Sequence, residues 1–349
     1  MAKTILGIDI GHDRLKLALV RGNRVMKTAS EEMPENLLKE GRITSVETLA
    51  ELLRTTMKQH GIHANHAAIV LPIDTVYIKN VVLPQMTVDQ LEYNLPYEFN
   101  DYITDEVKDY VFDYAVQKMN HEQDGPQGES GDNLGFGSDY SDQPEGANME
   151  LMAVATRREQ LEDLRLALRK AGLRLVKAAP AICSYISLIR KQQALFQKDV
   201  GECAVLDLGF EAIRLHMFRQ DRYLATRVLE IGLSSLDNVL TDIYGVDVHL
   251  AHTYLLTNFE NCLSRDECLE TYQNISVELM RALNFYRFSN PNSVLSDMWI
   301  CGGGEIMPLV ESIRDMLDLE LHPGEELVPN GSGIDACSSF VQAIGITMD

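Results

Sequence analysis

Two acidic turns, far apart in the sequence, carry the residue types that hold a phosphorylated ligand. Asp9 is followed two residues later by Gly11, and Asp207 is followed in the same way by Gly209. A glycine directly after a strand lets the backbone turn sharply and point its N–H groups at an anion, and aspartates hold Mg²⁺ through water. A single Asp-x-Gly is common at the end of a strand. Two copies in matching surroundings favour a pair of hairpins that grip a triphosphate from both sides.

A third turn of suitable composition is the glycine run formed by Gly302, Gly303 and Gly304. It lies between a predicted strand at Met298–Ile300 and a predicted helix at Pro308–Leu317. Glycines at the start of a helix let a flat anionic ligand lie close to the backbone. The alternative is an ordinary tight turn in which small residues are needed only for packing.

The same order of elements surrounds both acidic turns. Strands are predicted at Thr4–Ile10, Leu15–Val20 and Arg24–Ala29, and again at Glu202–Leu208, Ile213–Phe218 and Tyr223–Val228. In both sets the acidic turn joins the first strand to the second. This repetition predicts two similar α/β domains that face each other across a shared cleft.

The composition excludes several classes of protein. The 349 residues are 45% apolar and 24% charged, which is typical of a globular chain with a sizeable core. The net charge of −21 disfavours binding to nucleic acid or to anionic lipid. No apolar run approaches the about 18 residues of a membrane-spanning helix, and no signal-peptide pattern precedes the first strand. The six cysteines lack CxxC spacing, so we expect reduced thiols in a cytoplasmic protein.

The segment His121–Asn148 differs in composition from the rest of the chain. It has six Gly and seven Asp or Glu, but no Lys or Arg and no periodic apolar pattern. Such a stretch cannot bury enough surface to offset its ordering entropy, so it is predicted to be a disordered acidic loop. Its position between strand-like runs at Asp109–Gln117 and Met149–Ala155 favours the tip of a hairpin, with a domain linker as the alternative.

The segment Thr87–Tyr102 combines an apolar helical spacing with tyrosines. Leu91, Leu95 and Phe99 recur every four residues, and Tyr97 lies among them. One interpretation is the core helix of a small subdomain. The other is the wall of a groove that accepts an extended peptide, since apolar grooves rimmed by tyrosines suit such ligands.

Several motifs, taken in order, resemble a known superfamily. They are GIDIG at 7–11 with Lys16, LDLG at 206–209 and CGGG at 301–304. This set is similar to that of the actin, Hsp70 and sugar-kinase superfamily. The segments LPYEF at 95–99 and RALNFY at 281–286 further resemble the PilM family of type IV pilus assembly proteins, relatives of the cell-division protein FtsA.

The resemblance implies an α/β, actin-like fold of duplicated ribonuclease H-like domains with an FtsA-type small inserted subdomain. The first lobe would comprise residues 1–74, 175–199 and 334–349. The inserted subdomain would comprise 75–174, and the second lobe 200–333.

The resemblance also implies a function. The chain is expected to be a cytoplasmic adaptor of a type IV pilus or a related type II secretion assembly. It would bind the short cytoplasmic N-terminal peptide of a PilN-like inner-membrane protein, and other pilus-assembly components, without inserting into the membrane itself. In the family the peptide groove borders the small subdomain, which favours Leu91, Leu95, Tyr97 and Phe99 as its wall.

The resemblance further implies that ATP and Mg²⁺ bind in the cleft and modulate the adaptor. The matching cofactor-binding residues are Asp9, Gly11, Lys16, Asp207, Gly209, Gly302, Gly303 and Gly304. Asp9 and Asp207 would hold the Mg²⁺ through water.

The sequence departs from the superfamily pattern at the turn tips. His12-Asp13-Arg14 follows the first turn where relatives carry small hydroxyl residues, and Phe210-Glu211 follows the second. Asp13 and Glu211 would repel a triphosphate. The helix that offers Glu and Lys to the nucleoside in relatives reads AHTYL at 251–255, with neither charge. We therefore expect binding without turnover and assign no catalytic residue.

Two other functions remain as alternatives. The first is an active Mg-ATPase or sugar kinase of the same superfamily, in which Asp9 and Asp207 act on Mg²⁺ and water. The second is an FtsA-like filament protein tethered to the membrane. The net charge and the ending at Ile344–Asp349, which lacks a basic amphipathic helix, disfavour the second alternative.

Overall fold

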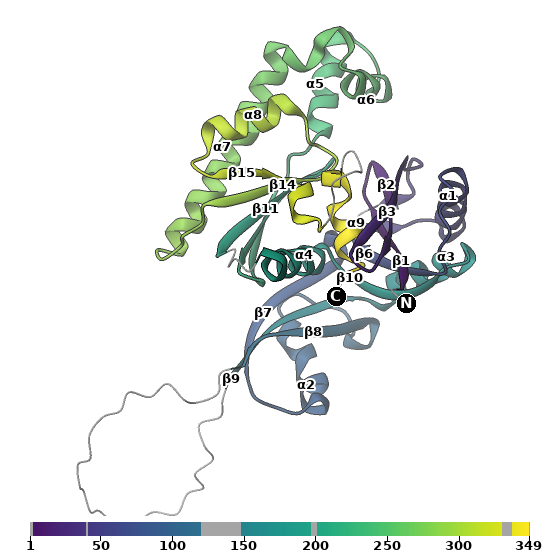
Figure 1. Cartoon of the computed structure of the whole chain (residues 1–349), viewed down its shortest axis with the longest axis vertical. Coiled ribbons are helices and arrows are strands. Elements are labelled where there is room, and N and C mark those ends of the chain that lie inside the picture. The colour runs from purple at the N-terminus through teal and green to yellow at the C-terminus, as the bar shows by residue number, and fades with distance from the viewer. Residues whose placement is uncertain (1–2, 40, 120–147, 197–200, 330–336, 349) are drawn as a thin grey trace, which may run out of the picture. The chain divides into compact units, whose positions relative to one another are not determined.

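A computed structural model describes residues 3–39, 41–119, 148–196, 201–329 and 337–348 (Figure 1). The chain divides into two units. Unit 1 comprises Met1–Thr75 and Glu162–Asp349, and unit 2 comprises Val76–Leu161. Unit 1 contains two lobes, each built on its own sheet. The predicted acidic loop at 121–148, apart from Asn148, lies outside the described residues.

The first lobe is built on a five-stranded sheet in the order β10-β6-β1-β2-β3. Its strands are β1 (Thr4–Ile10), β2 (Arg14–Arg21), β3 (Arg24–Glu32), β6 (His66–Leu71) and β10 (Arg174–Pro180). β1, β2 and β3 run antiparallel, whereas β6 and β10 add parallel strands beside β1. A short pair, β4 (Leu38–Lys39) and β5 (Arg42–Ile43), follows β3.

The second lobe repeats this arrangement in the order β13-β12-β11-β14-β15. Its strands are β11 (Glu202–Leu208), β12 (Ile213–Arg219), β13 (Arg222–Leu229), β14 (Asp297–Cys301) and β15 (Glu320–Pro323). The first three are again antiparallel and the last two are parallel additions. The duplication predicted from the two acidic turns is therefore present in the sheet topology.

Helices cover the two sheets (Figure 1). Those of the first lobe are α1 (Val46–Gln59), most of α3 (Arg158–Lys170), α4 (Ala181–Phe196) and α9 (Val341–Gly345). Those of the second lobe are α5 (Ser234–Tyr244), α6 (Val248–Thr257), α7 (Asp266–Ser289) and α8 (Met307–Met316). All seven residues of β11 are buried, as expected for a central strand with side chains packed on both faces.

Local sequence signals explain where several helices begin. The Ser45 side chain accepts a hydrogen bond from the N–H of Thr48 and thereby caps the start of α1. Asp247 caps α6 in the same way through the N–H of Leu250.

Unit 2 is a three-stranded antiparallel sheet in the order β7-β9-β8, with one helix. Its elements are β7 (Val76–Pro84), α2 (Val88–Asn94), β8 (Tyr110–Met119) and β9 (Asn148–Arg157). Pro96 ends the α-helical pattern, and the chain continues as a 3₁₀ turn over Leu95–Phe99. Unit 2 ends earlier than the predicted boundary at 174, because β10 pairs with β6 in the first lobe.

Candidate functional site

In each of the two hairpins, an acidic residue on the first strand lies opposite a basic residue on the second strand. Asp9 pairs with Lys16 across β1 and β2, and Asp207 pairs with Arg214 across β11 and β12. In both hairpins the base follows the acid by seven residues. The Lys16 Nζ lies 3.8 Å from the Asp9 Oδ2. Lys16 was predicted from the sequence and Arg214 was not, although Arg214 follows Asp207 by the same seven residues that separate Lys16 from Asp9.

Both acids are buried at the floor of the cleft, each with 7% of its surface exposed. Burial raises the pKa of Asp9, and Lys16 and Arg214 oppose this while Asp207 adds to it. Burial likewise raises the pKa of Asp207, against the attraction of Arg214 and Lys16. The Gln342 Nε2 on α9 donates a hydrogen bond of 2.8 Å to the Asp207 Oδ2. The floor is therefore a desolvated set of two acids and two bases.

The three glycines of the third turn have different roles. A Cβ at Gly302 would lie 2.5 Å from the Leu208 carbonyl oxygen, and its φ is +108°. A Cβ at Gly304 would lie 2.0 Å from the Leu233 Cδ1. Packing therefore requires glycine at both positions, as the packing alternative anticipated. A Cβ at Gly303 would meet nothing closer than the Lys16 Nζ at 3.7 Å, so of the three only Gly303 lines the cleft.

A small cavity separates the two hairpins. Its volume is about 110 Å³, below the roughly 300–1,000 Å³ typical of pockets for drug-sized ligands. It brings together Asp9, Gly11, Lys16, Asp207, Gly209 and Gly303 of the predicted site. Five carboxylates and three permanent cations line it, namely Asp9, Asp13, Asp74, Asp207 and Glu211 with Arg14, Lys16 and Arg214.

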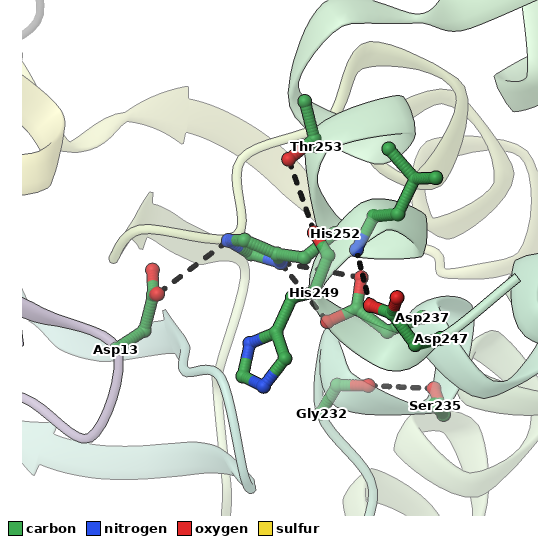
Figure 2. A network of polar contacts seen from close by, with 9 residues as sticks. Asp13, Gly232, Ser235, Asp237, Asp247, His249, His252 and Thr253 are labelled. Atoms are coloured by element: carbon green, nitrogen blue, oxygen red, sulfur yellow. Dashed lines mark hydrogen bonds and ion pairs between the residues drawn. The ribbon is translucent and has the colours of Figure 1, made fainter. Parts of the chain in front are cut away.

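Side chains of the two lobes contact each other near the turns. The Arg214 Nη2 donates to the Asp74 Oδ1 at 3.3 Å. The His252 Nδ1 of α6 lies 2.9 Å from the Asp237 Oδ2 on α5, and its Nε2 lies 3.5 Å from the Asp13 Oδ1 (Figure 2). The Phe210 ring meets the His252 ring edge to face at a centroid distance of 5.5 Å. Asp13 and Phe210, which depart from the superfamily pattern, thus both contact His252.

These residues do not fit a magnesium nucleotide in the arrangement that the structure describes. Lys16 and Arg214 are already balanced by Asp9 and Asp207, and the remaining lining carries more negative than positive charge. An added triphosphate would meet that excess in a partly desolvated space, where like charges repel strongly. The small volume of the cavity, about 110 Å³, also disfavours a nucleotide.

The predicted partner residues lie in unit 2. Leu91, Leu95 and Phe99 are buried in its core with the apolar residues of β7, β8 and β9. Tyr97 has 56% of its surface exposed. The first three side chains therefore hold the subdomain together and are not available to an external peptide. This burial corrects the prediction that they form the wall of a peptide groove. Tyr97 is the member of the set that a partner can reach.

Among the residues that the structure describes, Asp297, Glu320 and His322 on β14 and β15 form the one group with metal-ligand spacing, and Asp9 and Asp207 do not belong to it. Within the same residues, no helix is both long and apolar enough to cross a bilayer.

The duplicated strand order and the paired hairpins define an actin-like α/β fold. A solved structure entitled "PilM-PilN type IV pilus biogenesis complex" superimposes with a TM-score of 0.75 at 23% identity, covering 98% of this chain and 97% of that chain. The ethanolamine utilization protein EutJ from Carboxydothermus hydrogenoformans has a TM-score of 0.57 at 12% identity, covering 99% and 89%. No curated protein sequence gives a significant match.

The family described as type IV pilus assembly protein PilM matches residues 7–127 and 136–322. This match spans most of the chain and both units. The chain therefore belongs to the PilM family of type IV pilus assembly proteins.

Proposed function

We propose that this chain is a cytoplasmic adaptor that binds the short N-terminal tail of a PilN-like inner-membrane protein. The observation that supports this most directly is the likeness, over almost the full length of both chains, to a protein solved as a PilM–PilN complex. Family membership over residues 7–127 and 136–322 supports the same function. The partner would recruit the adaptor to the inner face of the cell membrane.

The exposed tyrosines of unit 2 offer a surface of suitable chemistry. Tyr93, Tyr97 and Tyr102 each expose more than half of their surface. The rings of Tyr93 and Tyr97 lie 5.8 Å apart, and the Tyr97 hydroxyl donates to the Tyr93 hydroxyl at 3.4 Å. Rigid aromatic side chains with a polar tip contribute contact area at low entropic cost, which suits recognition of an extended peptide.

The charge of the chain indicates the kind of tail that it would prefer. A net charge of −21 favours a peptide that carries basic residues beside apolar ones. Association should then slow as salt is added, because screening removes the long-range attraction.

Turnover of ATP is not part of this proposal. The superfamily reaction depends on nearly complete electrostatic positioning of the phosphates, and the described cleft holds balanced ion pairs in that place. Partner binding by itself is sufficient for an adaptor. A steady Mg-dependent release of phosphate that Asp207→Asn abolishes would instead support the ATPase alternative.

Titration of a fluorescently labelled synthetic peptide of the PilN-like tail tests the proposal. We expect saturable binding, and Tyr97→Ala should weaken it by about tenfold because an exposed aromatic anchor is lost. Phe288→Ala is the matched control, since Phe288 is an exposed aromatic residue on α7 of unit 1. Absence of saturable binding to the wild-type chain, or equal weakening by both variants, would contradict the proposal.

A further inference from the structure

Two histidines on one face of α6 each lie opposite a carboxylate of the first lobe. His249 and His252 are three residues apart, which places them on the same side of the helix. The His249 Nε2 lies 2.9 Å from the Glu35 Oε1, and the His252 Nε2 lies 3.5 Å from the Asp13 Oδ1. Helix α6 therefore directs two imidazoles at carboxylates of the first lobe.

The His252 ring lies between carboxylates of both lobes (Figure 2). Its Nδ1 is within hydrogen-bonding distance of both Asp237 oxygens, at 2.9 and 3.2 Å, so this nitrogen must carry a proton. A neutral ring would then point the Nε2 lone pair at Asp13, which accepts but does not donate. Only an imidazolium, with a proton on each nitrogen, makes both contacts favourable.

Asp13, the first-lobe partner of His252, is held in place by a backbone hydrogen bond within the first lobe. The N–H of Met33, at the end of β3, donates to the Asp13 carbonyl oxygen at 2.8 Å. Asp13 and the chain toward Glu35 are thereby fixed together. Arg214 and Asp74 form a further contact between the lobes at 3.3 Å, beside the cavity.

We propose that Asp13 and His252 form a latch that holds the two lobes of unit 1 together. The closed state then depends on the protonation of one imidazole. This inference concerns the cleft of unit 1 and stands independently of the partner-binding proposal.

The groups that face His252 set the pH range of the latch. The hydrogen bond that His252 donates to Asp237 raises the pKa of His252, and burial lowers it. Attraction to Asp237, to Asp13 and to Glu32 of β3 raises this pKa further, with a net increase. The latch contribution is therefore complete below the ordinary histidine pKa and is lost as pH rises through the elevated value. The Phe210 ring also contacts His252 but carries no charge.

Protonation of Asp13 limits the strength of the latch at low pH. Burial raises the pKa of its carboxyl, and attraction to His252 and Arg14 lowers it, with a net increase above the ordinary value. The latch needs this carboxylate ionised, so it weakens again in acid. Its strength should therefore pass through a maximum between the two pKa values.

A double-mutant cycle on the full chain tests the latch. The folding equilibrium constants of wild type, Asp13→Asn, His252→Gln and the double variant are measured by urea unfolding at pH 6 and pH 9. We expect the two substitutions to be coupled about tenfold at pH 6 and less than twofold at pH 9. His252→Gln also removes the contact with Asp237, but this loss occurs in both the single and the double variant. It therefore cancels, and the coupling reports the pairing of Asp13 with His252 alone.

The cycle of Glu35→Gln and His249→Gln is the matched control. Both of those side chains are mostly exposed, so coupling below twofold is expected at both pH values. Coupling between Asp13 and His252 that is absent at pH 6, or equal at pH 6 and pH 9, would overturn the latch.

If His252→Gln does not fold, NMR titration of the His252 imidazole replaces the cycle. The pKa of His252 should fall in Asp13→Asn relative to wild type, because one of the two facing carboxylates is neutralised. An unchanged pKa would overturn the proposal equally.

Discussion

The β1–β2 hairpin and the β11–β12 hairpin place an acid opposite a base at the same step, yet their turns are held differently. The second turn is fixed by the start of α5, where the N–H groups of Leu233 and Ser234 donate to the carbonyl oxygens of Gly209 and Phe210 at 3.2 and 3.0 Å. The first turn is fixed from its own lobe, by the N–H of Met33, and directs Asp13 toward α6.

This difference separates what the duplicated scaffold determines from what it leaves open. The paired strands determine the acid and base at the floor of both hairpins, because the ladder register places them opposite each other. The tips are free to take other side chains, and here Asp13 at the first tip connects its lobe to α6 of the second. The chemistry of the cleft is therefore decided at the tips and cannot be read from the two Asp-x-Gly turns alone.

The largest effect is expected from removal of one base at the floor. Arg214→Met leaves two buried carboxylates with one cation and also breaks the contact with Asp74, so we expect a loss of about 3 kcal/mol in unfolding free energy. Lys16→Met should cost less, because the Lys16 Nζ lies 3.8 Å from the Asp9 Oδ2, farther than the 3.3 Å that separates Arg214 from Asp74. Urea unfolding measures both.

The loss should depend on pH with a definite sign. Burial raises the pKa of Asp9 and Asp207 in the folded state, so their ionisation destabilises the fold as pH rises. Without Arg214 this cost grows, and the deficit of Arg214→Met should be larger at pH 8 than at pH 5. A deficit that is the same at both pH values would show that the floor is not electrostatically balanced.

A smaller effect should distinguish the two turn glycines. A Cβ at Gly209 would lie 2.4 Å from the Ala212 carbonyl oxygen, whereas a Cβ at Gly11 would lie 3.0 Å from the Arg14 carbonyl oxygen. Overpacking against the backbone should make Gly209→Ala cost about 2 kcal/mol and Gly11→Ala below about 1 kcal/mol. Thermal unfolding of the two variants checks the order, and the reverse order would mean that the first turn is the more rigid one.

Much of the fold could be predicted from the sequence, because it rests on local and repeated signals. The two sets of three strands have a short-range cause, because each set has an Asp-x-Gly turn between its first and second strands, and the structure shows both sets. The strand β15 was not predicted. It is only four residues long, and its position depends on pairing with β14.

The candidate site was predicted less completely, for a physical reason. Asp9, Lys16 and Asp207 were found because they repeat in matching strands, and Arg214 was detectable by the same spacing. His252, Asp74 and Gln342 reach the cleft from other elements, and no short-range pattern links them to it. The tertiary arrangement also shows what the glycine run does, because Leu208 and Leu233 pack against it.

Calorimetric titration of Mg-ATP into the wild-type chain, beside Asp207→Asn, tests most directly the claim that the chain's own ion pairs occupy this cleft. The account predicts no saturable heat for either protein. A saturable one-to-one isotherm for the wild type that disappears in Asp207→Asn would contradict it and would restore the nucleotide to the cleft.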